Sequence, residues 1–188
     1  YAHGGSGGEV WVQRLTVTEY IETVRSTVGV DIATEAREML PPDLRADGFT
    51  NTAYNLNVDL KHVEAYTRLA DIIVGRMDVS KFAGRFTKSR RLDADKLDDF
   101  VAAMGKWILR GPLDQQEIAL YRGIASTVTG AGGDFDDAAR YMIEAMLQAP
   151  RFIYRIEDQR GNGSPRAAGP YEVASRMSYI LWGGPPDE

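Results

Sequence analysis

The sequence predicts a mainly α-helical, multi-helix fold, with two helical subregions and the start of a third. Apolar residues recur at three- and four-residue spacing along most of the chain, and capping residues mark where these segments begin and end. No strongly alternating pair of strands is evident. Hydrophobic residues make up 44% of the 188 residues and charged residues 26%, which is ordinary for a globular protein with a sizeable core.

Shifts in glycine, proline and charge content divide the chain into an expected series of segments. In chain order these are a flexible lead-in at 1–12, an N-terminal helical domain at 13–77, a charged connector at 78–96, a second helical domain at 97–158, a linker at 159–169, and the start of a truncated third helical domain at 170–188.

The first helix of the N-terminal domain is predicted over residues 17–28. Thr16 and Glu19 have the spacing of a capping box, in which hydroxyl and carboxylate bind free backbone amides. Gly29 stands where a helix C-cap is expected. A shorter helix is predicted over 32–39. It ends there because Pro41 and Pro42, which follow Leu40, cannot continue a helix.

A long irregular loop is predicted near residues 43–58, which are rich in Asp, Asn and Gly and show no helical period. Loops of this length are often functional, so Phe49, Asn51 and Asn55 are candidate interaction residues. The alternative is that the loop only packs its own apolar side chains into the core.

A long amphipathic helix is then predicted from Asp59 to about Met77. The connector that follows carries a basic cluster, formed by Arg85, Lys88, Arg90 and Arg91. Acidic residues surround this cluster, so a solvated connection is favoured over an anion-binding site.

Three further apolar stripes predict the helices of the second domain. The middle one begins after Asp114, which has Glu117 three residues later, and the last one reaches Leu147 before Pro150. The next stretch, PRFIYRIED, is too short for periodicity to separate a helix from an extended segment. A final helix is predicted from Tyr171 to about Trp182.

Residues suited to catalysis or metal binding are few. The chain has no cysteine, and its two histidines are His3 in the lead-in and His62 within a predicted helix. The acidic clusters DFDD and DADKLDD are read as helix starts rather than metal sites, because neither has the pattern of a calcium loop. We therefore predict no catalytic, cofactor-binding or metal-binding residue within this chain.

The bulk properties bear on partners. A net charge of −5 argues against nucleic acid as the main partner, since phosphate binding needs a basic surface. No apolar run approaches the length of a membrane span. The aromatic residues, Trp11 among them, suggest a polysaccharide-binding module only weakly, because aromatics at helical spacing are usually core.

Four stretches resemble a family of proteins known chiefly from planctomycetes. They are RLTVTEYIETVRSTVGVD at 14–31, PPDLRADGFTNTAYNLNV at 41–58, RGPLDQQEIALYRGI with MIEAMLQAPRFIYRIE between 110 and 157, and YEVASRMSYILWGGPPDE at 171–188. The family is the cytochrome-associated group of extracytoplasmic proteins built from consecutive domains of unknown function, the 1587, 1595 and 1592 series.

The resemblance implies a longer, exported parent protein with an extracytoplasmic location. It implies other protein chains, or the remainder of the same polypeptide, as partners, with a c-type cytochrome as a candidate among them. The chain lacks the CxxCH motif that attaches haem c. Any haem c would therefore be held by a segment outside this chain or by a partner.

The expected function is that of a non-catalytic helical scaffold or interaction module. The alternative is a supporting part of an exported redox or hydrolytic enzyme whose active site lies outside these residues. Besides the loop residues, the candidate interaction positions are Arg151, Phe152, Arg155, Tyr179 and Trp182. The arginines and Phe152 are equally explicable as buried structural groups, with an arginine clamping backbone carbonyls.

Overall fold

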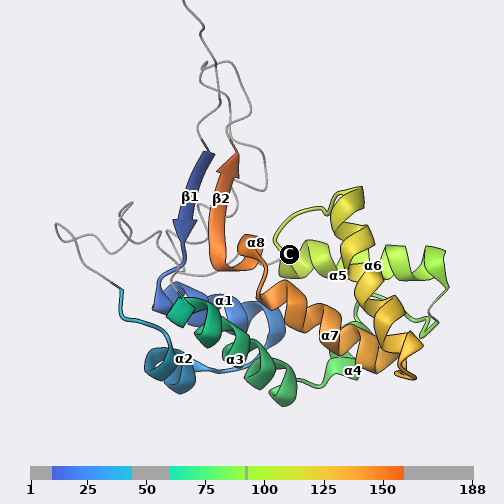
Figure 1. The fold of residues 1–188 in the computed structure, drawn as a ribbon, viewed down its shortest axis with the longest axis horizontal. Helices are drawn as coiled ribbons and strands as arrows, with labels where there is room; N and C mark the ends of the chain where they lie inside the picture. The colour runs from blue at the N-terminus through green and yellow to red at the C-terminus, as the bar shows by residue number, and fades with distance from the viewer. Residues whose placement is uncertain (1–9, 44–59, 92, 159–188) are drawn as a thin grey trace, which may run out of the picture.

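The computed structural model describes residues 10–43, 60–91 and 93–158. Within these residues eight helices form a body from which a two-stranded ribbon projects (Figure 1). None of the described helices is long and apolar enough to cross a membrane. The elements are β1 (Val10–Arg14), α1 (Val17–Val28), α2 (Ala33–Met39), α3 (Leu60–Arg76), α4 (Val79–Ala83), α5 (Ala94–Ile108), α6 (Gln115–Gly130), α7 (Phe135–Leu147), α8 (Pro150–Ile153) and β2 (Tyr154–Asp158).

The mainly helical fold predicted from the sequence is confirmed, and several helix ends lie where their capping residues placed them. Thr16 and Glu19 form the expected capping box at the start of α1, and Gly29 ends this helix with a φ of 74°. That left-handed conformation is one that glycine adopts without a steric penalty. Asp114 and Asp134 begin α6 and α7 with capping boxes of the same kind.

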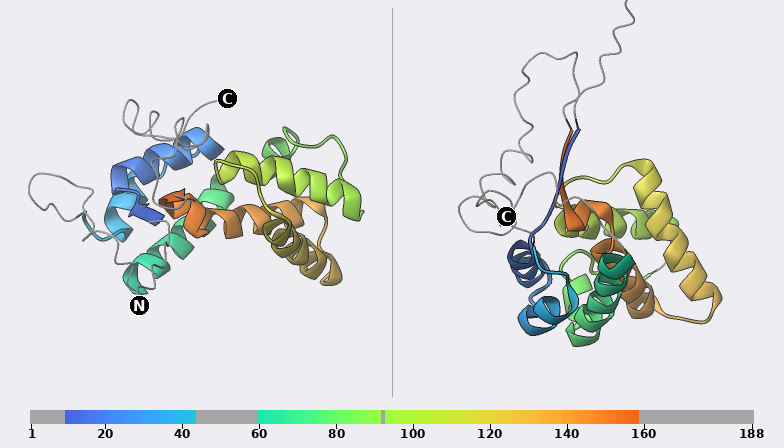
Figure 2. Two further views of the ribbon diagram at one scale, coloured as in Figure 1. Left: turned by 90° about the horizontal axis from the view of Figure 1, so that it is seen from above. Right: turned by 60° about the vertical axis from the view of Figure 1, so that its left-hand side comes forward.

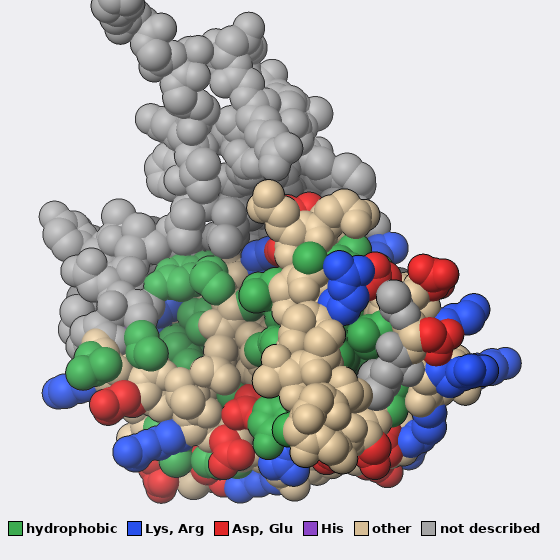
Figure 3. Space-filling view, turned by 45° about the vertical axis from the view of Figure 1, so that its right-hand side comes forward, with side chains coloured by type: hydrophobic (Ala, Val, Ile, Leu, Met, Phe, Trp, Pro, Cys, Tyr) green, Lys and Arg blue, Asp and Glu red, His purple; other side chains and the backbone are tan. Residues whose placement is uncertain are grey.

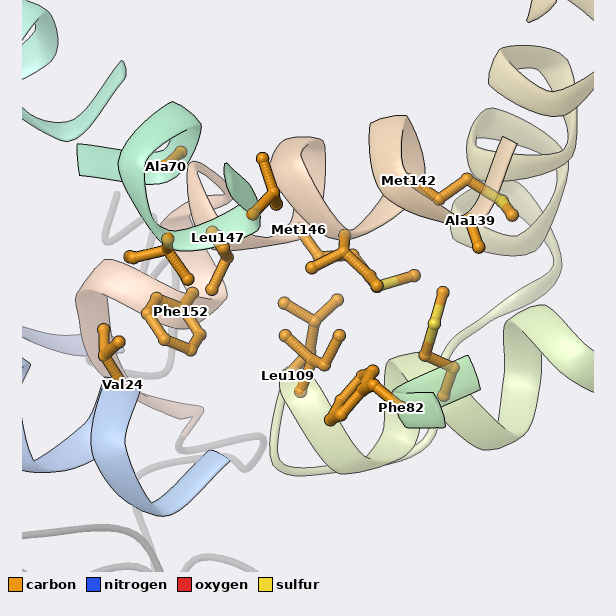
Figure 4. Packing of buried hydrophobic residues seen from close by; sticks show 14 of the residues in the cluster. Val24, Ala70, Phe82, Leu109, Ala139, Met142, Met146, Leu147 and Phe152 are labelled. Carbon is orange, nitrogen blue, oxygen red and sulfur yellow. The ribbon is translucent and has the colours of Figure 1, made fainter. Parts of the chain in front are cut away.

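The two predicted helical subregions share one hydrophobic core, with α7 at its centre. This helix packs against α3 of the first subregion and against α5 and α6 of the second. Viewed from above, it runs between the two groups of helices (Figure 2). Its inward face is fully buried and includes Ala139, Met142, Met146 and Leu147. In the core, Phe152 and Val24 lie at one side and Phe82 at the other (Figure 4).

The predicted connector at 78–96 differs from the solvated segment that was expected. Part of it folds into α4, whose Phe82 and Ala83 are buried in the core. The guanidinium of Arg85 lies 4.6 Å from the ring centroid of Trp107 in a cation–π contact. Arg90 pairs with Asp136 of α7 at 2.8 Å. The basic cluster therefore helps to fasten the connector to the helices around it.

The ribbon is the element that the sequence did not predict. Strands β1 and β2 pair antiparallel, with Val10 opposite Asp158 and Arg14 opposite Tyr154. The lead-in predicted for 1–12 therefore ends earlier, since β1 begins at Val10. PRFIYRIED turns out to be both of its alternatives, a short helix (α8) followed by a strand (β2). Five-residue strands from opposite ends of the described chain carry too little local pattern to reveal their pairing.

An ion pair between α2 and α3 should make stability depend on acid pH. Hydrogen bonding from Arg76 lowers the pKa of Glu35 below its usual value. A carboxyl whose pKa is lower in the folded state contributes stability above its unfolded pKa and loses it as pH falls through the folded pKa. Because Glu35 is only half-buried and Arg76 is exposed, water reaches the ion pair and the effect should be small.

We expect Glu35→Gln to lower the free energy of unfolding slightly at pH 7, and the difference from the parent chain to be smaller at pH 3, because protonation of Glu35 on acidification removes the charge that Arg76 stabilises. Urea titrations at the two pH values measure this, with Glu38→Gln on the same helix as the control. An undiminished difference at low pH would show that the carboxylate charge is not the cause.

Candidate functional site at the base of the ribbon

Several residues singled out in the sequence lie outside the described part of the chain. One candidate that the structure does describe is Arg155, which belongs to β2 and whose backbone pairs with Gln13 of β1. The positions that fall outside the described residues are Phe49, Asn51, Asn55, Tyr179 and Trp182.

The remaining two, Arg151 and Phe152, meet three other motif residues where the ribbon leaves the helical body. We call this set, Arg14, Asp43, Arg110, Arg151 and Phe152, the ribbon base. Each belongs to one of the sequence stretches quoted above. Leu15 extends the strand pairing into this region by donating its backbone amide to the carbonyl of Ile153 at 2.9 Å.

Arg151 fastens α8 to the start of α6. Its Nη1 donates to both carboxylate oxygens of Glu117, at 2.7 and 2.8 Å. The same guanidinium donates to the carbonyl of Pro112 at 3.3 Å. Glu117 also accepts from the backbone amide of Asp114 in the α6 capping box. One carboxylate therefore caps the start of α6 and also binds an arginine from 34 residues away.

Arg110 makes the clamp on backbone carbonyls that the sequence analysis sought at Arg151. Its Nη2 donates to the carbonyls of Arg151, of Phe152 at 2.9 Å and of Tyr154 at 3.3 Å. These carbonyls lie where α8 passes into β2, and the guanidinium also lies 5.6 Å from the ring centroid of Phe152. Sequence reasoning missed Arg110, although it is the first residue of RGPLDQQE.

The backbone at Arg110 is itself unusual, with a φ of 60°. A non-glycine residue in the left-handed region costs about 1–2 kcal/mol. Strain of this kind persists only where surrounding contacts over-determine the conformation. The hydrogen bonds from Arg110 to three carbonyls and its contact with the Phe152 ring supply such contacts. The side chain of Arg110 therefore stabilises the strained backbone of the same residue.

A second arginine, Arg14, is buried on the other side of the ribbon base. Its side chain is 4% exposed and pairs with Asp43 at 3.1 Å. The other carboxylate oxygen of Asp43 accepts the backbone amide of Val17, in the first turn of α1, at 2.8 Å. Asp43 thus joins the end of the described N-terminal segment to both β1 and α1. Neither residue was singled out in the sequence.

Phe152 is fully buried and joins three helices through aromatic contacts. Its ring lies edge-on to Tyr20 of α1 at 6.1 Å, and Tyr20 lies edge-on to Tyr66 of α3 at 5.1 Å. Edge-to-face pairs at such distances are favourable because the ring edge is positive and its face negative. These contacts leave Phe152 no surface on which to meet a partner, which is the structural alternative raised for this residue.

The titratable groups at and around the ribbon base are suited to structure rather than to catalysis. Burial raises the pKa of Tyr20 and, against the opposing effect of Arg14, that of Tyr66. Both phenols are therefore protonated at neutral pH and cannot act as anionic nucleophiles or bases. Within residues 10–43, 60–91 and 93–158, no group of three or more His, Asp or Glu side chains is placed to hold a metal ion.

Removing the Arg110 clamp should destabilise the whole helical body. We expect Arg110→Ala to lower the free energy of unfolding by about 2 kcal/mol, because three carbonyls lose a charged donor. Arg110→Gly should lose about 1 kcal/mol less than alanine, because glycine relieves the left-handed strain. Arg110→Lys should fall near alanine, since an ammonium lacks the planar fork. Urea titration measures all three.

The matched control is Arg91→Ala, since the Arg91 side chain is 81% exposed and only 3.5 Å from Asp93. It should change stability by less than about 0.5 kcal/mol. If alanine and glycine at position 110 proved equally destabilising, the strain argument would be wrong. If both matched the control, the clamp itself would contribute nothing.

Comparison with known proteins places these contacts in two adjacent domains. Residues 13–79 match the model of PSD3, a protein of unknown function (DUF1587), and residues 96–157 match that of PSD5, a protein of unknown function (DUF1595). No curated protein and no solved structure matches the chain. Arg14 and Asp43 lie in the first matched region, and Arg110, Arg151 and Phe152 lie in the second. The chain therefore contains a PSD3 (DUF1587) domain followed directly by a PSD5 (DUF1595) domain.

Proposed function

We propose that this chain is a non-catalytic helical scaffold or interaction module of a larger extracytoplasmic protein or complex. The observation that supports the proposal is the use of the motif side chains. Arg110 and Arg151 hold backbone carbonyls and a capping carboxylate, and Phe152 is sealed in the core. Side chains used in this way make a rigid unit on which other domains can be mounted.

The shared core also favours a scaffold role. The two matched domains are joined through α7, through the ribbon and through the indole of Trp107, which donates to the carbonyl of Thr27 at 2.8 Å. Two domains that bury their faces against each other move as one body. Such a body presents its outer surfaces in a fixed geometry, which an assembly requires.

Association with a c-type cytochrome, and with it an extracytoplasmic location, is the finer part of the proposal. It rests on the four motif resemblances. Haem c would be held by a segment or partner outside this chain, and the described residues would contribute only a docking surface. The alternative is a supporting part of an exported redox or hydrolytic enzyme, with the active site in the domains outside this chain.

Native mass spectrometry and absorption spectroscopy of the longer protein together test the proposal. A scaffold predicts a complex of fixed stoichiometry, and a cytochrome association predicts a Soret band that co-purifies with it. Arg110→Ala, which releases the turn that carries β2 to its partner strand β1, should weaken the complex, while the Arg91→Ala control should not. Turnover of a substrate by residues 1–188 alone would overturn the non-catalytic proposal.

A further inference from the structure

An open groove runs between α6 and α7 on the outer side of the second domain. Its volume is about 710 Å³. The walls are mostly apolar and include Ile124 and Val128 from α6, Ala131 at its C-cap, and Tyr141 and Ala145 from α7. Glu144 and Asp137 add carboxylates to the α7 wall, and Asp137 already accepts the backbone amide of Asp134 in the α7 capping box. Grooves between two helices with an apolar floor are typical seats for a third amphipathic helix.

One of the large apolar side chains that the described residues expose lines the groove, and another lies one helical turn from a groove residue. Tyr141 lines the groove and is 53% exposed, and Leu120, 64% exposed, precedes Ile124 by one helical turn on the same face of α6. Gln148, which also lines the groove, accepts a hydrogen bond from Thr67 of α3. Thr67 lies one helical turn after Val63, which is 51% exposed. The space-filling view shows hydrophobic side chains across the left and centre of one face, with charged side chains along its lower and right-hand edges (Figure 3).

A suitable occupant exists in the same chain. Thirty residues follow Asp158, and the helix predicted at 171–182 has the sequence YEVASRMSYILW. Val173, Met177, Ile180 and Leu181 fall at helical spacing and would form one apolar stripe. A helix of this length spans about 18 Å. The 12 residues between Asp158 and Tyr171 span up to about 40 Å when extended, so the segment can return to the body from the end of β2.

The groove offers a carboxylate to Arg176, which is the one basic residue of this predicted helix. Arg176 precedes Met177 and lies at the edge of the predicted stripe, where it can meet the Glu144 carboxylate on the groove wall. Tyr179 and Trp182 project from the other side of the predicted helix. A helix seated in the groove would thus keep these two aromatics outward, available to whatever packs on the third domain.

We propose that the groove between α6 and α7 is the seat of the helix at 171–182 of the same chain, with the Val173–Met177–Ile180–Leu181 stripe against the apolar walls and Arg176 against Glu144. The inference deepens the scaffold role proposed above, because it mounts the third domain on the second at a defined surface. It requires no partner molecule.

Cysteine trapping tests the seat in the full chain, which has no cysteine of its own. The test pair is Thr127→Cys with Met177→Cys, since Thr127 lines the groove and is exposed. The control pair is Ser126→Cys with Met177→Cys. Ser126 is also exposed but points about 100° away around α6, and both pairs have the same tether.

Under mild oxidation the test pair should form an intramolecular disulfide at least tenfold faster than the control, at a rate independent of protein concentration. Glu144→Arg should slow trapping, and adding Arg176→Glu should restore it. Equal rates for the two pairs would overturn the proposal. Disulfides that form between chains in proportion to concentration would instead identify a second copy as the occupant and also overturn it.

The readout is independent of assembly. If trapping succeeds while the longer protein forms no complex, the scaffold role fails and the seat remains. If complexes form without trapping, the seat is wrong and the scaffold role remains.

Discussion

Truncation of Phe152 to alanine should lower the free energy of unfolding by about 4 kcal/mol, the largest loss expected for any single substitution considered in this chain. The side chain is fully buried, and its ring is in edge-on contact with Tyr20. Removing it takes away buried apolar surface and leaves a cavity among α1, α7 and α8 that helices fixed at both ends cannot fill. Urea titration followed by circular dichroism measures the loss.

Two further variants test whether the loss of stability comes from removing the buried Phe152 side chain at the ribbon base. Phe152→Leu keeps much of the volume and should recover more than half of the loss. Tyr141→Ala removes an aromatic that is 53% exposed and should change stability by less than about 0.5 kcal/mol. An alanine variant at position 152 as stable as the Tyr141 variant would show that the ribbon base does not hold the domains together.

Replacing Asp43 with alanine should cost about 3 kcal/mol, because it removes the carboxylate partner of a buried arginine. Arg14 is 4% exposed, so its guanidinium has little access to water that could replace the carboxylate. The substitution also removes the acceptor for the backbone amide of Val17 at the start of α1. Asp43→Asn, which keeps an oxygen acceptor, should cost less than alanine.

The double variant Arg14→Met with Asp43→Leu tests whether the loss comes from leaving the buried charge of Arg14 without its partner. Replacing both members of a buried ion pair by apolar residues is often nearly neutral. We expect the double variant to be more stable than Asp43→Ala, as measured by the midpoint of urea unfolding. If the double variant were the less stable of the two, the desolvated charge of Arg14 would not be the cause of the loss.

Local patterns were enough to predict the long helices, although α4 was not predicted and α8 was left undecided. Spacing and capping residues placed α1, α6 and α7 within a residue or so, because a capping box acts within four residues and needs no distant partner. The resemblance to the 1587 and 1595 domains was also readable from short motifs, and both family matches confirm it.

The site was less accessible to sequence reasoning. Arg151 and Phe152 were singled out, but the clamp on the carbonyls belongs to Arg110, 42 residues from Phe152. Nothing local distinguishes an arginine that will reach α8 from one that remains in water. The same holds for Arg14 and Asp43, which are 29 residues apart. The signal that could have found them was their common presence in the four motifs.

By itself the sequence determined the helical class and the starts of α1, α6 and α7, since these depend on hydrogen bonds and apolar spacing within a few residues. Only the tertiary structure decided that β1 pairs with β2, that Phe82 and Ala83 of the connector are buried, and that the two domains share a core around α7. These features depend on contacts between segments that are distant in the sequence. Such contacts bury apolar surface and provide hydrogen-bond donors for backbone carbonyls only once the chain has folded.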